Sequence, residues 1–251
     1  MCGRYSLKHP PPVLEEEFAA IGIEPFPPRY NIAPTQPILI IAPGLVPEPG
    51  SNRPQRVGQL VRWGFIPSWV KDVKAFPMLI NARAETATDK ASFRAAMRHR
   101  RVIVPASGFY EWKRVGKKVA QAYWIRPRHG GVIGFAGLME TYAEPGGSEM
   151  DTAAILTTGA NSRIAQIHDR MPVVVRPEHY GRWLDCIRNE PRDVADIMEP
   201  VEPDFFEAIP VSDKVNKVAN VGPDLQDEVP LAESEPETPA ESAGGGQLSL
   251  F

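Results

Sequence analysis

The chain has 251 residues, a formal net charge of −3 at pH 7 and 43% hydrophobic residues, which is enough for a sizeable core. The sequence has no run of about 18 apolar residues, which excludes a transmembrane helix. Its first residues lack the basic region followed by an apolar stretch that marks a secretory signal, so we expect a cytoplasmic protein. Cys2 and Cys186 make neither a disulfide framework nor a zinc pattern, and we expect no metal or organic cofactor. The apolar surroundings of Cys186 are typical of a buried, structural helix position.

The predicted elements are short, because the chain contains 27 prolines. In chain order, the apolar patterns predict a helix at 13–21, a strand at 37–42, a helix at 92–100, strands at 102–105, 132–136 and 153–158, a helix at 162–167, a strand at 173–175 and a helix at 178–187. Strands dominate and show no regular βαβ rhythm. The pattern favours the α+β class, as a single domain with a mixed or antiparallel, barrel-like sheet and flanking helices.

The charge is unevenly distributed along the chain. Residues 224–251 hold seven acidic residues and no Lys or Arg, so residues 1–223 alone carry +4. This basic body permits binding to a polyanion. We therefore expect a folded domain at 1–223, an acidic, disordered Pro/Ser/Gly-rich linker at 224–246, and a distinct terminal peptide, Gln247-Leu248-Ser249-Leu250-Phe251.

The start of the chain, Met1-Cys2-Gly3-Arg4, carries the first chemical signal. Cys2 is small enough for an aminopeptidase to remove Met1, which would leave an N-terminal cysteine with a thiol and a free α-amine on adjacent carbons. Such a residue can attack an aldehyde with nitrogen and then close a five-membered ring with sulfur. Taken alone, Cys2 is equally compatible with an ordinary cysteine at a frayed terminus.

Polar and aromatic clusters recur between the predicted elements, and each also has a structural reading. Asn81 and Arg83 share one face of a short apolar segment, and Glu111 lies between aromatic residues, where desolvation raises a carboxyl pKa. His168 stands beside Asp169 in a turn. Further members of these clusters are Arg4, Asn31, Trp63 and Trp69.

Eight segments, in order, resemble the SRAP (SOS response-associated peptidase) family of abasic-site processing proteins. They are MCGRYS, RYNIAP, WGFIPSW, NARAET, VPASGFYEWK, GLME, LTTGAN and IHDRMPV. The resemblance implies an α+β domain with a positively charged groove for single-stranded DNA. It also implies a DNA damage response role and covalent capture of abasic sites by the N-terminal cysteine, through a Schiff base and then a thiazolidine, with lyase- or peptidase-like chemistry once Met1 is removed.

The same resemblance implies a role for each matching residue. Cys2 is the nucleophile, Glu111 assists proton transfer, His168 promotes opening of the sugar ring and reversal of the adduct, and Asn81 orients the sugar. The expected DNA-binding residues are Arg4, Arg83, Asn31, Trp63 and Trp69. Family members often carry a second aromatic residue where this chain has Val70, which predicts a weaker wedge on the 3′ side.

Two other functions remain open from the sequence, an N-terminal-nucleophile cysteine peptidase and a module that binds single-stranded or modified DNA without chemistry. The terminal peptide adds a partner, because it resembles the QL(S/D)LF motif by which bacterial replication proteins bind the β sliding clamp. In that interpretation Gln247, Leu248, Leu250 and Phe251 are the contact residues at the end of a tether. We expect a monomer associated with the nucleoid or replication fork.

Overall fold

The computed structural model describes residues 2–44, 56–115, 119–144 and 146–231. The predicted tail, Met1 and most of the predicted linker lie outside the described residues. No helix in the described ranges is long and apolar enough to span a membrane.

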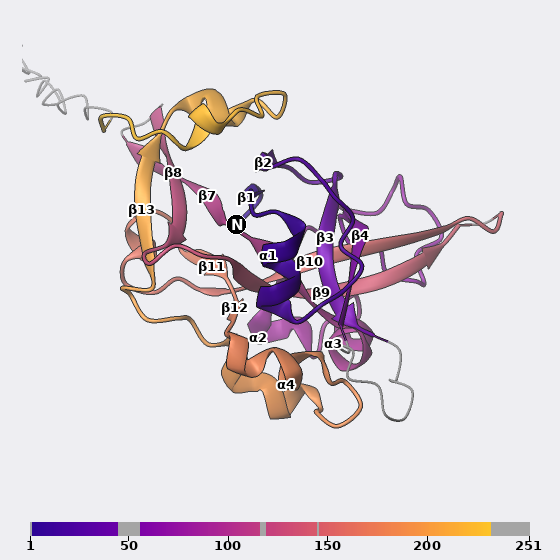
Figure 1. The fold of residues 1–251 in the computed structure, drawn as a ribbon. Coiled ribbons are helices and arrows are strands. Elements are labelled where there is room, and N and C mark those ends of the chain that lie inside the picture. Colours follow the sequence, from indigo (N-terminus) through magenta and orange to yellow (C-terminus); the bar gives the residue numbers. More distant parts are fainter. Residues whose placement is uncertain (1, 45–55, 116–118, 145, 232–251) are drawn as a thin grey trace, which may run out of the picture.

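The centre of the molecule is a closed, mixed barrel of strands β3, β4, β6, β9 and β10 (Figure 1). The larger sheet runs β11-β10-β4-β3-β6-β9-β12, and β9 also pairs with β10, which closes the ring. Only the β10–β4 contact in this ring is parallel. The strands are β3 Pro37–Pro43, β4 Arg56–Trp63, β6 Arg101–Ala106, β9 Ile133–Ala143, β10 Glu149–Gly159, β11 Arg170–Pro172 and β12 Val174–Val175.

A second sheet, ordered β13-β8-β7-β1-β2, lies against the barrel. It brings the start of the chain between two distant segments, because β1 pairs with both β2 and β7. Phe109 of this sheet packs edge to face against Phe135 of the barrel and against Phe206 of its own sheet, so the two sheets share one core. The strands are β1 Tyr5–Leu7, β2 Arg29–Ile32, β7 Gly108–Val115, β8 Val119–Pro127 and β13 Phe206–Val211.

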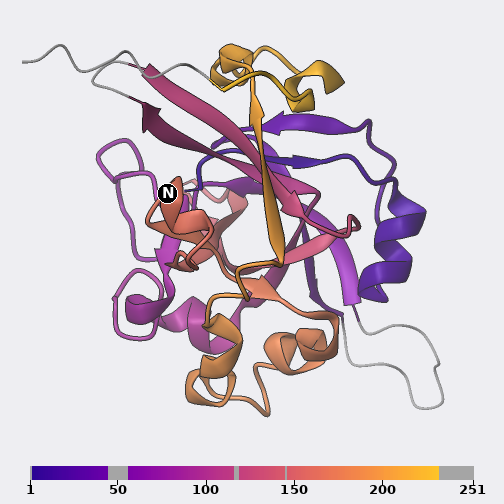
Figure 2. The ribbon, with the colours of Figure 1, turned by 90° about the vertical axis from the view of Figure 1, so that its left-hand side faces the viewer.

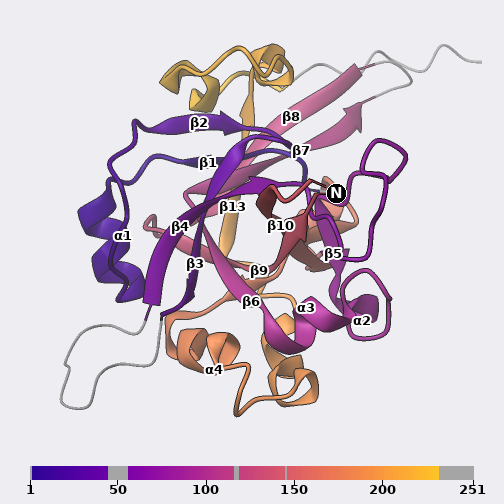
Figure 3. The same cartoon turned by 90° about the vertical axis from the view of Figure 1, so that its right-hand side faces the viewer.

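The helices are short and cover the barrel. The helices are α1 Pro11–Phe18, α2 Ala84–Ala87, α3 Arg94–His99 and α4 Tyr180–Leu184. One further strand, β5 (Asn81–Arg83), pairs in parallel with β10. Five 3₁₀ segments are assigned in the described residues, Ile164–Gln166, Pro177–His179, Pro191–Met198, Asp213–Asn216 and Pro223–Gln226. Figure 3 shows α2 and α3 beside β5 and β6, with α4 nearby.

The predicted α+β class and barrel-like sheet are confirmed, and the five predicted strands fall within β3, β6, β9, β10 and β12 or overlap them closely. Helix α1 ends at Phe18 rather than at residue 21, because Ala19 takes a left-handed conformation with φ of 45° and Ile21 pairs with Val57. The predicted helix at 162–167 is a single 3₁₀ turn.

Two features near the C-terminal end differ from the sequence-based predictions. The predicted helix at 178–187 ends at Leu184, so Cys186 is not a buried helix residue; it lies half-buried in the turn that follows. The folded part also extends past residue 223, where we placed the start of the linker. Leu225 is buried in the core and the amide of Val229 donates to the carbonyl of Pro210 at 2.9 Å.

Candidate functional site

Cys2 lies at the junction of the two sheets. Its side chain is 0% exposed, and its thiol donates to the carbonyl of Arg4 at 3.8 Å. The same carbonyl accepts the amide of Tyr110 at 2.9 Å, which extends the pairing of β1 with β7 and sets Cys2 beside that strand. Burial, and then the charge of Glu111, raise the pKa of the Cys2 thiol well above its usual range. The thiol is therefore protonated at neutral pH.

Glu111 belongs to β7, which the sequence analysis did not recognise as a strand. Strand alternation turns Phe109 and Glu111 to the opposite face from Tyr110 and Trp112. Phe109 fills the core, so Glu111 follows it inward and is buried. Burial raises the pKa of this carboxyl to about 7. It can therefore take up or release a proton at physiological pH.

Asn81 connects Cys2 to the barrel. It is the first residue of β5, whose parallel pairing places Asn81 opposite Ile155 and Arg83 opposite Thr157 of β10. The Asn81 side chain donates from Nδ2 to the carbonyl of Cys2 at 2.9 Å. Its Oδ1 is buried and has no hydrogen-bond partner among the described residues. A buried acceptor without a described partner thus lies in the side chain that holds the Cys2 carbonyl.

His168 lies in the turn before β11, which pairs with the C-terminal end of β10 on the side opposite to β5. The imidazole Nδ1 accepts the amide of Arg170 at 3.0 Å, and the Asp169 carboxylate lies 3.0 Å from the same nitrogen. Burial lowers the pKa of His168. The ring is therefore mainly neutral at pH 7, and a hydrogen bond from the Arg170 amide to Nδ1 requires the proton of the ring to be on Nε2.

An ion pair that the sequence analysis did not single out joins these segments. Arg170 donates to both carboxylate oxygens of Glu85, at 2.5 and 2.9 Å, and to the carbonyl of Thr157 at 2.5 Å. Glu85 follows β5 directly, in α2. Glu85 belongs to the segment NARAET and Arg170 to the segment IHDRMPV. Nothing in the sequence shows that these two residues, which are far apart in the chain, form an ion pair.

The predicted DNA-binding residues fall into two groups. Arg83 is exposed beside Asn81, and Trp69 is 57% exposed on the β4–β5 loop, edge to face with Phe76. Figures 2 and 3 show this loop beside the start of the chain. Val70 is buried against Ile66 and Tyr142, so it supports the loop from within.

The other three predicted DNA-binding residues have structural contacts. Trp63 is 0% exposed, packs edge to face on Tyr5 and donates to the carbonyl of Ile80 at 2.9 Å, so no ring face is open to a base. Arg4 donates to Asn31 Oδ1 at 2.8 Å and to the carbonyl of Val215 at 2.7 Å. Asn31 is buried and holds three further carbonyl contacts in residues 215–220.

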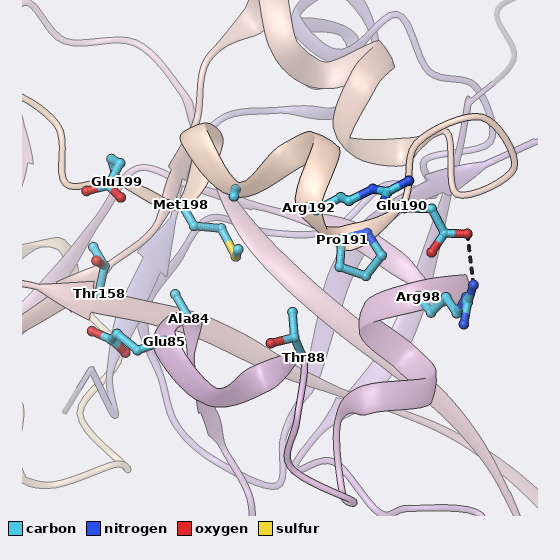
Figure 4. Close-up of a pocket in the computed structure, with 11 residues that line it drawn as sticks. Ala84, Glu85, Thr88, Arg98, Thr158, Glu190, Pro191, Arg192, Met198 and Glu199 are labelled. Atoms are coloured by element: carbon cyan, nitrogen blue, oxygen red, sulfur yellow. Dashed lines mark hydrogen bonds and ion pairs between the residues drawn. The ribbon is translucent and has the colours of Figure 1, made fainter.

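An open cavity of about 730 Å³ borders the site on the side of α2 (Figure 4). Glu85 and Thr158 lie at one end, and the ion pair of Arg98 with Glu190 lies at the other. No group of three or more His, Cys, Asp or Glu side chains in the described ranges is arranged to hold a metal ion.

The fold and the site define an α+β barrel protein with a buried cysteine near its start, beside a carboxyl and an amide, and with an imidazole in the turn before β11. The sequence model described as SOS response associated peptidase (SRAP) matches residues 1–218. The chain belongs to this family.

Curated relatives agree with that assignment, and a solved structure has the same fold. The abasic site processing protein YoqW of Bacillus subtilis is 39% identical over 228 residues, which cover 90% of this chain and 98% of the relative. The abasic site processing protein YedK of Escherichia coli is 32% identical, with the same coverage. A protein structure from Bacteroides thetaiotaomicron covers 91% of this chain and all of its own at a TM-score of 0.78 and 22% identity, which shows the fold.

Proposed function

We propose that this protein processes abasic sites in single-stranded DNA by forming a covalent bond through Cys2 after loss of Met1. Membership of the SRAP family and the names of its relatives support abasic sites as the substrate. The observation that carries the chemistry is the burial of Cys2 beside Glu111 and Asn81, two groups able to exchange protons or hydrogen bonds with an amine and a sugar.

The reaction begins at the α-amine that Met1 removal exposes. The amine attacks C1′ of the ring-opened sugar, and the carbinolamine loses water to give a Schiff base. The thiol then adds across the C=N bond, sulfur to carbon and its proton to nitrogen, and closes a thiazolidine. Ring closure is intramolecular and therefore fast. The net change is one aldehyde, one amine and one thiol converted to the ring and one water.

The neighbouring groups fit these proton movements. Glu111, half ionised near pH 7, accepts the proton that the amine releases and returns one to the departing water. Opening of the sugar moves the proton of the C1′ hydroxyl to the ring oxygen through water, and a neutral His168 with its proton on Nε2 assists by donating a hydrogen bond to that oxygen. The orphaned Oδ1 of Asn81 accepts from a sugar hydroxyl or from the amine.

The state of the thiol favours this order of steps over a cysteine peptidase. A peptidase attacks first with a thiolate, whose pKa is lowered by a nearby cation. Here burial and the Glu111 carboxylate raise the pKa of the thiol. A thiol that keeps its proton is a poor first nucleophile for a peptide bond, whereas in the proposed order the amine attacks first and the thiol adds only to the adjacent imine.

A denaturing gel tests the proposal directly. Processed protein mixed with single-stranded DNA that carries one abasic site should give a heat-stable adduct. Cys2→Ala should abolish it, and Cys2→Ser should leave only an imine that borohydride must trap. An adduct of undiminished yield and stability in Cys2→Ala would refute the mechanism, and DNA binding without any adduct in the wild type would indicate a non-covalent binding module.

We also propose that Gln247, Leu248, Leu250 and Phe251 bind the β sliding clamp. These residues lie outside the described part of the chain, so the proposal rests on the sequence: three large apolar anchors follow a segment rich in Glu, Pro, Ser, Ala and Gly. Such a segment loses conformational entropy when it docks, which favours a reversible contact.

A further inference from the structure

Glu85 connects two parts of the candidate site. It makes no contact with Cys2 among the interactions of the described residues. On one side it follows β5, whose first residue, Asn81, holds the carbonyl of Cys2. On the other it receives both terminal nitrogens of Arg170. A two-pronged contact of this kind fixes the guanidinium plane as well as its distance.

Arg170 passes that constraint to His168. Its side chain is 11% exposed and also donates to the Thr157 carbonyl of β10, while its backbone amide donates to His168 Nδ1. Side chain and amide belong to one residue, so holding the guanidinium against α2 and β10 also holds the amide that contacts the imidazole.

His168 Nδ1 has a competing neighbour. The Asp169 carboxylate lies as close to Nδ1 as the Arg170 amide does, 3.0 Å in each case. The amide needs a lone pair on Nδ1, whereas the carboxylate needs a proton there. The other charges that act on the imidazole are those of Arg170 and of the chain's amino terminus. The tautomer of the neutral ring therefore depends on which neighbour prevails.

We infer that Glu85 is a positioning residue that, through Arg170, keeps the neutral His168 ring in the tautomer with its proton on Nε2. In this form Nε2 is a donor, which is what opening of the sugar ring needs. The tautomer itself is independent of any substrate; only its consequence for adduct formation rests on the proposed function.

The surroundings of Glu85 make it suitable for substitution. Its side chain is 51% exposed and lies on the wall of the cavity in Figure 4. Glu85→Gln removes the charge and one of the two acceptors that face Arg170 and keeps the size of the side chain. Glu202→Gln is a matched control, because Glu202 is 49% exposed, is paired with Arg176 and likewise has its pKa lowered first by that arginine.

The tautomer can be read directly in the full chain without DNA. Proteins labelled with ¹⁵N-histidine are compared by long-range ¹H–¹⁵N correlation above pH 7, with His168→Gln used to assign the signal. Wild type and Glu202→Gln should show His168 protonated at Nε2, and Glu85→Gln should shift population to the form protonated at Nδ1. An unchanged His168 signal in Glu85→Gln overturns the inference. Arg170→Lys, which keeps the charge and the amide but loses the two-pronged contact, should reproduce the shift and replaces Glu85→Gln if that variant does not fold.

Adduct formation then separates this inference from the proposed function. Glu85→Gln should slow adduct formation about tenfold, which is roughly the contribution of one hydrogen bond, while Glu202→Gln should match the wild type. A tautomer shift without any adduct in the wild type would reject the proposed function and retain the inference. Normal adduct formation in all proteins together with an unchanged tautomer would reject the inference alone.

Discussion

At the scale of single residues, Glu111 combines burial with a pKa of about 7. In the unfolded chain a glutamate ionises near pH 4.3, roughly. Its pKa is thus raised on folding, so protonation at residue 111 stabilises the folded state. That contribution is complete below the unfolded pKa and is lost as the pH rises through about 7.

Replacement by glutamine, which never ionises, should remove this pH dependence. We expect Glu111→Gln to gain stability relative to the wild type between pH 5 and pH 9, by at most about 3 kcal/mol. Denaturant unfolding of both proteins at the two pH values measures the difference in unfolding free energy. A difference that stays constant with pH would show that the carboxyl is not perturbed, and adduct formation should fall in the variant at every pH.

The residue scale is also where the sequence was most informative. Cys2, Asn81, Glu111 and His168 were selected from motifs, and the structure places them near the start of the chain and the C-terminal end of β10. Trp63 shows the limit of this reasoning. Its type and neighbours suit both a stacking platform and a core residue, and only the strand pairing of β4 turns it inward against Tyr5.

At the scale of elements, residues 212–229 form a C-terminal cover over the second sheet, seen in yellow in Figure 1. Val215 and Leu225 of this cover pack with Tyr110 and Trp124. Asn31 attaches it from the opposite side, donating to the carbonyls of Val215, Lys217 and Asn220 at 3.3, 3.1 and 2.8 Å. The cover thus supports the strands that carry Arg4 and Glu111.

We therefore expect Asn31→Ala to loosen the cover. Loss of the amide removes one donor from each of the three carbonyls and the acceptor of Arg4, which should cost about 2 kcal/mol of unfolding free energy. Hydrogen exchange should accelerate at residues 213–229 well before the barrel exchanges. Asn189→Ala is the control, because that amide makes one local contact, to the carbonyl of Asp185. Uniform exchange across the chain in Asn31→Ala would contradict a local attachment.

Several strands that mix polar and apolar residues were not predicted from the sequence. Strands β4, β7, β8 and β13 carry charged or polar residues within them, such as Arg62, Lys113 and Glu207, so their apolar runs are broken. Each is nevertheless a strand because it pairs with a neighbour over most of its length. Local pattern cannot supply that pairing, since the partner strand lies elsewhere in the chain.

At the scale of the whole molecule, the site exists because three separate parts of the chain meet. The start of the chain is held by β7, β5 is held by β10, and the turn at 168–170 is held by β11 and Glu85. The closed barrel fixes the distances among these contacts, because no strand in the ring can shift without breaking two ladders. Such long-range pairing explains why motifs could name the residues but not the Glu85–Arg170 contact that joins them.

The boundary of the folded body gives a prediction at this same scale. A chain ending at residue 231 keeps Leu225, 1% exposed, and the bond from Val229 to Pro210, so it should unfold at the same denaturant concentration as the full chain. A chain ending at residue 223 loses both and should be less stable by about 2–5 kcal/mol, the usual cost of removing a buried leucine. Both comparisons use equilibrium unfolding, and equal stability of the two shortened chains would place the boundary where composition alone put it.

The chain ending at residue 231 also tests the terminal peptide. It should still cross-link abasic DNA, because every described contact of the site remains, yet it should lose binding to the β sliding clamp, because residues 247–251 are gone. Clamp binding equal to that of the full chain would refute the assignment of the terminal peptide.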